Sequence, residues 1–315
     1  MIEASGLTKD HPGGRAVDHV DFTVRPGSVT GFLGPNGAGK STTMRMIVGL
    51  DRPTSGRVTV NGRAYAEHRA PLGEVGALLD ATAVHGGRTA RAHLLSLAAT
   101  HGIHPRRVDE VLEMAGLASV ARRRVGTFSL GMGQRLGIAA ALLGDPRTLI
   151  LDEPVNGLDP EGVLWIRTLL RGLAAEGRTV LLSSHLMSEM ALTADHLLIL
   201  GRGRVIVDAP TRDVVERAQT RVVRARTPMR AELERALADR PGVGVVAVER
   251  DVLDVSGLDA PGIAAAASAA GVALHGLAPV PVSLEEAYMQ LTAGEVEHRS
   301  AASATAHDAP TGGRA

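Results

Sequence analysis

The sequence contains no cysteine and no long apolar run. Without cysteine, the 315-residue chain can form neither a disulfide framework nor a thiolate metal site, which fits a reducing compartment. No stretch reaches the roughly 18 apolar residues that a membrane-spanning helix needs. The opening residues, Met1 to Ala4, show neither the basic nor the apolar region of a secretory signal. We therefore expect a soluble, intracellular protein.

An excess of charge is also absent. The counts of Lys+Arg and Asp+Glu are both 34, so the formal net charge is zero. Proteins that bind nucleic acid usually present an excess of positive charge, and we therefore expect no nucleic-acid partner. Lysine itself is scarce, because Lys9 and Lys40 are the only two in the chain.

Lys40 lies in a glycine-rich stretch with a distinctive context. An apolar run, Val29 to Leu33, predicts a buried strand before it, and a helix-compatible run from Thr42 to Leu50 follows it. The P-loop pattern G-x-x-x-x-G-K-[ST] is filled by Gly34, Gly39, Lys40 and Ser41. The alternative, a glycine-rich turn before a core helix, is disfavoured by this strand-loop-helix order.

Each P-loop residue suits phosphate chemistry. Gly37 and Gly39 allow successive backbone N–H groups to face the phosphates at the positive end of the following helix. Lys40 supplies positive charge to the β- and γ-phosphates, and the Ser41 hydroxyl is a hard oxygen ligand suited to Mg²⁺. We therefore predict a nucleotide site that also includes the neighbouring residues Asn36 and Thr42.

A second apolar strand ends in two carboxylates. The run Thr148 to Leu151 is followed by Asp152 and Glu153, the form of a Walker B segment. Such a strand would deliver Asp152 beside the Mg²⁺ at its carboxyl end and leave Glu153 free to reach water at the γ-phosphate. An Asp-Glu pair of this kind is often only a capping turn, but the upstream P-loop favours the catalytic interpretation.

Three further segments are ambiguous when taken alone, and only their order along the chain indicates a function. Ser129 opens an apolar run and could be no more than a helix cap. Asp159 precedes a predicted helix from about Glu161 to Ala175. His185 follows the strand Thr179 to Leu182, where an isolated histidine is usually structural or solvated.

Taken in order, these segments resemble the nucleotide-binding subunit of an ATP-binding cassette (ABC) transporter, from about Met1 to Val215. The resemblance implies a dimer in which ATP lies between the P-loop of one copy and the signature segment of the other. Asp152 would support Mg²⁺, Glu153 would polarise the attacking water, and His185 would contact the γ-phosphate. From the partner copy, Ser129 and Gly131 would meet the γ-phosphate, and the loop of Asp159 would cross between sites.

Three positions depart from the family pattern. The signature reads Phe128-Ser129-Leu130-Gly131-Met132 in place of Leu-Ser-Gly-Gly-Gln. His11 takes the place of the aromatic residue that stacks on adenine, with Arg15 as an alternative cover for the base. Asp80 replaces a glutamine and could still reach Mg²⁺ or water. Departures of this sort fit a bacterial branch of drug, antibiotic and lantibiotic exporters.

The fold expected from this resemblance is an α/β P-loop NTPase cassette over residues 1–217. It comprises a RecA-like core, an antiparallel β region at its start and a helical insertion from Thr89 to Arg124. Asn61-Gly62 predicts a hairpin after the strand Arg57 to Val60. A small ferredoxin-like α+β domain is expected over residues 218–293, ending in a strand from Val272 to Leu277 and a terminal helix. Residues 294–315 are small and polar, which predicts a disordered tail.

The resulting functional hypothesis is a Mg²⁺-dependent ATPase that pairs with a second ATP-binding subunit, most simply its own copy. It would drive a separate transmembrane permease from the inner face of the cell membrane, for export of a drug, antibiotic or lipid-like compound. The alternatives are an importer subunit or a soluble ABC ATPase. A ribosome-acting relative would usually carry two cassettes, and a DNA-repair ATPase would carry long heptad coils within the cassette.

Overall fold

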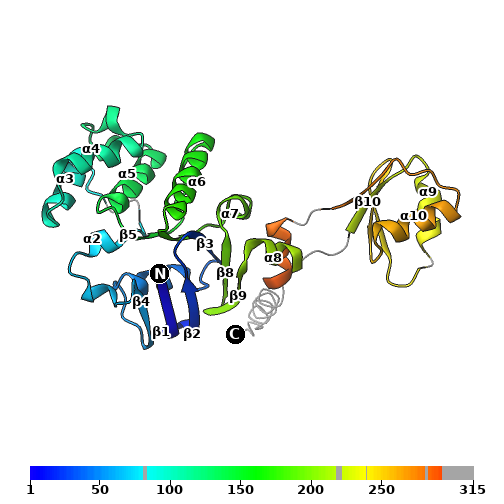
Figure 1. The fold of residues 1–315 in the computed structure, drawn as a ribbon, viewed down its shortest axis with the longest axis horizontal. Helices are drawn as coiled ribbons and strands as arrows, with labels where there is room; N and C mark the ends of the chain where they lie inside the picture. The colour runs from blue at the N-terminus through cyan, green and yellow to red at the C-terminus, as the bar shows by residue number, and fades with distance from the viewer. Residues whose placement is uncertain (81–83, 218–221, 239, 281–282, 293–315) are drawn as a thin grey trace, which may run out of the picture. The chain divides into compact units, whose positions relative to one another are not determined.

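The computed structural model describes residues 1–80, 84–217, 222–238, 240–280 and 283–292. They form two compact units, Met1–Thr211 and Arg212–Ala293 (Figure 1). The tail expected from Gly294 to Ala315 lies outside the described residues. In the part of the chain that the structure describes, no helix is long and apolar enough to cross a membrane.

The first unit begins with a three-stranded antiparallel sheet in the order β2-β1-β4. Its strands are β1 (Ile2–His11), β2 (Gly14–Val24) and β4 (Ser55–Val60). The alternation of apolar and polar residues in β2 buries one face of the sheet, because successive side chains in a strand point to opposite sides. This sheet is the antiparallel β region that the sequence predicts.

The hairpin predicted at Asn61-Gly62 is wrong. Both residues have positive φ, 51° and 82°, so the tight turn does form. Beyond it, however, only Arg63 bridges back to Val60, and the chain enters a 3₁₀ turn at Tyr65–Glu67. β4 instead pairs with β1, because that pairing completes the buried face of the first sheet.

The centre of the first unit is a six-stranded sheet in the order β5-β6-β7-β3-β8-β9. The first five strands are parallel, and β9 is antiparallel to β8. Crossover connections place β3 between β7 and β8, far from its neighbours in sequence. The strands are β3 (Ser28–Leu33), β5 (Val75–Leu78), β6 (Thr148–Leu151), β7 (Thr179–Ser183), β8 (His196–Gly201) and β9 (Arg204–Pro210).

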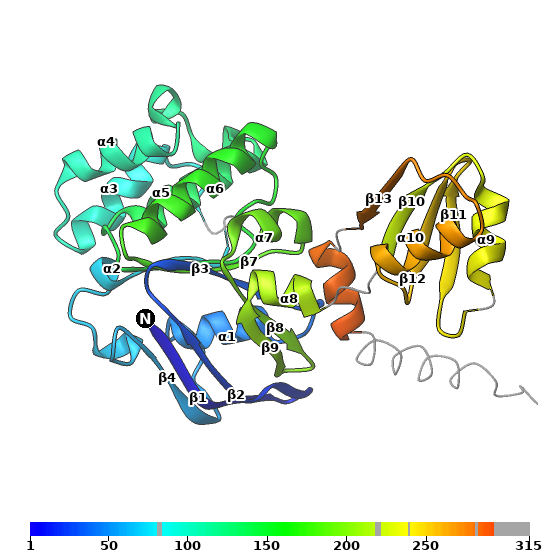
Figure 2. The ribbon, with the colours of Figure 1, turned by 45° about the vertical axis from the view of Figure 1, so that its right-hand side comes forward.

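Helices cover both faces of this sheet (Figure 2). The helix α1 (Lys40–Ile47) packs in one core with the three-stranded sheet, while α6 (Pro160–Ala175) and α7 (Met187–Thr193) contact β3 on the other face. The predicted insertion contains α3 (Ala90–Thr100) and α4 (Pro105–Met114), which follow the short α2 (Pro71–Glu74). Next along the chain is α5 (Leu130–Leu142), which packs against β5.

The second unit has its own sheet and core. Its sheet is antiparallel with the order β11-β12-β10-β13. Two helices interrupt the strands in the order β-α-β-β-α-β and share a buried core with the sheet. The elements are α8 (Thr211–Arg217), β10 (Val222–Arg226), α9 (Arg230–Ala238), β11 (Gly244–Glu249), β12 (Val252–Ser256), α10 (Ala260–Ala269), β13 (Gly276–Pro279) and a helix over residues 284–292.

The strand predicted from Val272 to Leu277 is displaced. The observed strand β13 spans Gly276–Pro279, where it pairs with β10. Val272 is buried immediately after α10, because Gly271 with φ of 66° turns the chain back toward the core. The apolar character of Val272 thus reflects packing against the core after α10 and not membership of a strand.

Candidate nucleotide site

The P-loop of the structure connects β3 to α1 at the carboxyl end of the parallel sheet. Gly39 has φ of 101°, and a Cβ there would lie 2.5 Å from the carbonyl oxygen of Ala16. Glycine is therefore required both for the backbone conformation and for the close approach. The loop surrounds a hollow of about 250 Å³ lined by Ala16, Asn36, Gly37, Ala38, Gly39, Lys40, Ser41 and Thr42. Apart from Gly34, the residues predicted to bind the nucleotide from the P-loop and its flank all line this hollow, namely Asn36, Gly37, Gly39, Lys40, Ser41 and Thr42.

Lys40 is the half-buried cation of this hollow. Its Nζ donates hydrogen bonds to the carbonyl oxygens of Gly34 at 2.6 Å and Pro35 at 3.3 Å. Burial lowers the pKa of Lys40, and the nearby carboxylates of Glu153 and Asp152 act in the opposite direction. The hollow therefore holds a partly desolvated cation, whose attraction for an anionic ligand is less screened than in bulk water.

Ser41 and Asp152 bring two hard oxygen ligands together. The Ser41 hydroxyl donates to Asp152 Oδ2 at 2.7 Å, across 111 positions of sequence. No group of three or more His, Asp or Glu side chains in the described ranges could hold a metal ion. Mg²⁺ is usually held by one or two carboxylates together with phosphate oxygens, so this pair fits a magnesium ion that arrives with its nucleotide.

Glu153 and His185 form a pair beside Asp152. The Nδ1 atom of His185 lies 2.8 Å from Glu153 Oε2, and the backbone N–H of His185 donates to the same oxygen at 3.3 Å. Since a carboxylate only accepts, Nδ1 carries the proton in this contact. Glu153 has φ of 50°, a left-handed conformation that is uncommon for a residue with a side chain. Glu153 thus holds its contact with His185 from an uncommon backbone conformation.

Two residues that the sequence did not single out hold this arrangement. Ser183 Oγ donates to Asp152 Oδ1 at 2.5 Å and accepts from the Glu153 N–H at 2.9 Å. The buried Gln134 side chain donates to the Glu153 carbonyl oxygen at 3.1 Å. The role of Ser183 follows from the pairing of β6 with β7, and sequence alone offers no signal for that adjacency.

The signature segment and the Asp159 loop have local structural roles. Ser129 caps α5 by accepting from the Met132 N–H at 3.2 Å, and Asp159 caps α6 by accepting from the Gly162 N–H at 2.8 Å. A Cβ at Gly131 would lie 2.6 Å from the Gly157 carbonyl oxygen, so the start of α5 packs closely on the Asp159 loop. The caps of Ser129 and Asp159 are exposed, which leaves them accessible to another molecule.

His11 and Asp80 lie outside the P-loop hollow. His11 is the exposed last residue of β1 and pairs with Gly14 across the β1–β2 turn, whereas Ala16 of β2 lines the hollow. Arg15, the alternative cover for a base, forms ion pairs with Asp10 and Asp18. Asp80 is exposed and follows β5, the strand beside β6, at the same edge of the sheet as Asp152.

Known proteins resemble this chain in sequence. A family model described as ABC transporter matches residues 17–156, and one described as a domain of unknown function matches residues 221–285. The bacitracin transport ATP-binding protein BcrA of Bacillus licheniformis is 43% identical over 213 residues, which are 67% of this chain and 70% of that protein. The lantibiotic transport ATP-binding protein SrtF of Streptococcus pyogenes is 34% identical over 66% of this chain and 90% of its own length.

Solved structures resemble it in fold. The ATP-binding subunit of an ABC transporter is 28% identical with a TM-score of 0.63, over 69% of this chain and 92% of that structure. An ATP-binding cassette solved as a dimer in a post-hydrolysis state with ADP and Pi is 26% identical with a TM-score of 0.62, over 67% of this chain and 99% of its own. These likenesses confirm the predicted α/β cassette, and the chain belongs to the family of ABC transporter ATP-binding proteins.

Proposed function

We propose that this chain hydrolyses Mg-ATP at the site formed by the P-loop and the carboxyl ends of β6 and β7. The observation that carries the proposal is the convergence of three groups from distant segments. The Ser41 hydroxyl donates to Asp152 Oδ2 at 2.7 Å. Glu153 is the next residue in the chain, and its Oε2 lies 2.8 Å from His185 Nδ1. A phosphate anchor, a pair of hard oxygen ligands and a carboxylate base thus share one edge of the sheet.

The charge of each group indicates its proposed role in ATP binding and hydrolysis. Lys40 and the backbone N–H groups of Gly37 and Gly39 would bind the β- and γ-phosphates. Ser41 and Asp152 would hold Mg²⁺, with Asp80 at the same edge, and the bound ion would neutralise developing phosphate charge. Glu153 would accept a proton from the attacking water, and His185, hydrogen-bonded to Glu153, would face the γ-phosphate.

We further propose that two copies complete each site. The exposed Ser129 and Asp159 and the adjacent Gly131 are not among the residues that line the P-loop hollow of their own chain. A related cassette was solved as a dimer with ADP and Pi. Two copies placed head to tail would bring Ser129 and Gly131 of one chain to the nucleotide of the other.

The transport partner is proposed from the relatives. Proteins named for bacitracin and lantibiotic transport share 43% and 34% identity with this chain. We infer that this chain powers a separate permease for export of a peptide antibiotic, from the cytoplasmic face of the membrane. Residues 1–217 would form the cassette and residues 218–293 a separate small domain.

The export role can be tested in a susceptible bacterial host. Expression of this chain together with a candidate permease, sought first among the genes next to its own, should raise the inhibitory concentration of bacitracin or a lantibiotic several-fold. The same pair with Glu153→Gln should not, and fractionation should find the chain on membranes only when the permease is present. Faster antibiotic accumulation in cells would instead indicate import, and co-sedimentation with ribosomes would favour a soluble ABC ATPase.

A further prediction concerns the contact between His11 and the adenine base of ATP. If His11 stacks on adenine, His11→Tyr should tighten ATP binding several-fold, because stacking on an aromatic ring contributes on the order of 1–3 kcal/mol per base. GTP should also compete with ATP better in the parent than in His11→Tyr. Nucleotide titrations of the parent, His11→Tyr and His11→Ala measure both effects. Equal ATP affinity in all three would show that His11, exposed at the β1–β2 turn, does not contact the base.

A further inference from the structure

The helix α7 depends on tertiary contacts, and its position bears on His185. It has seven residues, begins at Met187 just after His185, and its N-cap Leu186 makes no side-chain hydrogen bond. Helices this short are not stable in water by themselves. The position of α7 therefore depends on what it packs against, and a shift of α7 would also move the chain next to His185.

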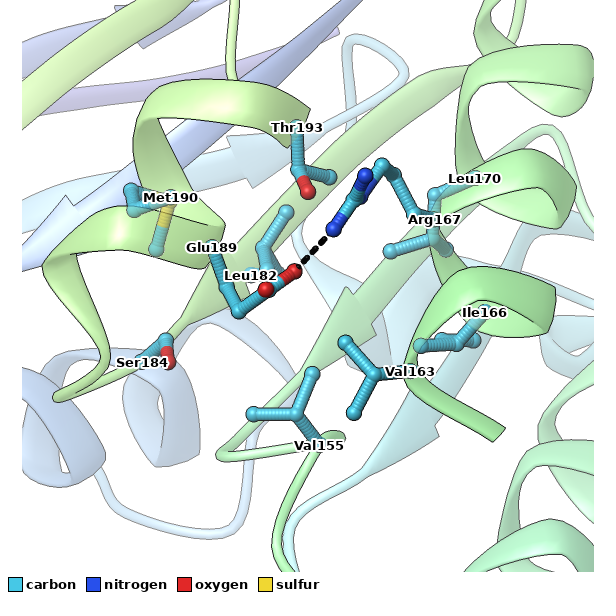
Figure 3. A pocket seen from close by; sticks show the side chains of 10 residues that line it. All are labelled: Val155, Val163, Ile166, Arg167, Leu170, Leu182, Ser184, Glu189, Met190 and Thr193. Carbon is cyan, nitrogen blue, oxygen red and sulfur yellow. Dashed lines mark hydrogen bonds and ion pairs between the residues drawn. The ribbon is translucent and has the colours of Figure 1, made fainter. Parts of the chain in front are cut away.

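Two contacts hold α7 in place. Met190 is buried against β3, where a Cβ on Gly31 would lie 2.3 Å from the Met190 sulfur. The second contact is an ion pair with α6, in which Arg167 Nη2 donates to Glu189 Oε2 at 2.5 Å (Figure 3). The two side chains of this ion pair are only 23% and 24% exposed. Partial burial strengthens their attraction and makes the loss of one partner costly.

The ion pair borders a small cavity that also touches the segments that carry Glu153 and His185. Its walls include Val155, which follows Glu153 closely in sequence, and Ser184, which precedes His185. Figure 3 shows both of these side chains together with Arg167 and Glu189 around the same space. The remaining walls are largely apolar and come from Val163, Ile166, Leu170, Leu182, Met190 and Thr193. A shift of α7 would therefore change the packing of Val155 and Ser184, which lie close in sequence to Glu153 and His185.

We propose that Arg167, acting through Glu189, is a positioning residue that keeps His185 within hydrogen-bond reach of Glu153. The role rests on the proposed ATP hydrolysis, because it concerns the same pair of groups. Arg167 does not line the P-loop hollow, so its effect should be on the chemical step and not on nucleotide binding. A displacement of about 1 Å at a catalytic group can lower a rate by up to about a hundredfold.

The test removes either partner and measures ATP hydrolysis by the full chain. Arg167→Met keeps the length of the side chain without its charge, and Glu189→Gln keeps its shape. Each should lower kcat by about tenfold and leave KM for ATP within about twofold, as expected when only positioning is lost. The double variant should be no slower than either single variant, because the two residues act as a unit. Arg171→Met is the matched control, since Arg171 is an exposed arginine of the same helix that also reaches α7, by a hydrogen bond to the Leu192 carbonyl oxygen at 3.3 Å.

A second measurement separates positioning from general damage. In a His185→Ala background, single-turnover hydrolysis of labelled ATP followed over hours should be unchanged by Arg167→Met, while thermal unfolding of each variant is recorded in parallel. An equal fractional loss in both backgrounds, or a loss that tracks the unfolded fraction, would overturn the positioning role. A parent chain that does not hydrolyse ATP would overturn the proposed function itself. An active parent with an equally active Arg167→Met would overturn only this inference.

Discussion

Glu153→Gln should abolish turnover and leave ATP binding intact. General-base catalysis contributes about 10²–10⁴-fold, and the amide cannot accept the proton from water. In the parent chain, His185 Nδ1 lies 2.8 Å from Glu153 Oε2. The amide oxygen of the variant can accept the same hydrogen bond, so the local geometry should survive. Steady-state phosphate release and nucleotide titration measure the two properties separately. Size-exclusion chromatography with Mg-ATP should then show the variant as a dimer, because the nucleotide that joins the two copies is no longer consumed.

Glu113→Gln is the control for this substitution. Glu113 is an exposed carboxylate of α4 in the helical insertion, and its replacement should leave hydrolysis at the parent rate. If Glu153→Gln hydrolyses ATP within about tenfold of the parent, another group must accept the proton. The role of Glu153 would then be limited to the hydrogen bonds that place His185.

Lys40→Ala should weaken nucleotide binding by at least about tenfold and remove hydrolysis, because one charge-assisted contact to phosphate is lost. In the structure, Lys40 Nζ is held over the P-loop by the Gly34 and Pro35 carbonyl oxygens. Its removal also leaves Asp152 and Glu153 without the cation that balances them, which further disfavours an anionic ligand. Titration with a fluorescent ATP analogue measures the affinity directly.

Lys9→Ala provides a matched control, since Lys9 is the only other lysine in the sequence. Its Nζ donates to the Arg52 carbonyl oxygen at 2.8 Å, and Lys9 is not among the residues that line the P-loop hollow. Lys9→Ala should therefore bind nucleotide like the parent. Equal affinity of Lys40→Ala and the parent would contradict the assignment of the P-loop as the phosphate site.

The sequence by itself determined the parts of the site that are local in the chain. The P-loop and the Asp152-Glu153 segment are recognisable because phosphate binding and strand ends impose fixed residue types at fixed short spacings. Helix caps such as Ser129 and Asp159 are local for the same reason, since each bonds a backbone N–H three residues onward. The order of these segments also identified the family that the comparisons confirm.

Only the tertiary structure decided which of these segments meet. The strand order places β6 beside β7, so Ser183 reaches Asp152 and Glu153, and His185 reaches Glu153. It likewise decided against the hairpin at Asn61-Gly62, because β4 pairs with β1, a strand far earlier in the sequence that pairs Ile2 with Val60 and Thr8 with Ser55. The physical reason is that local patterns depend on backbone geometry within a few residues. Partners across a sheet depend instead on the burial of apolar faces between segments far apart in the chain.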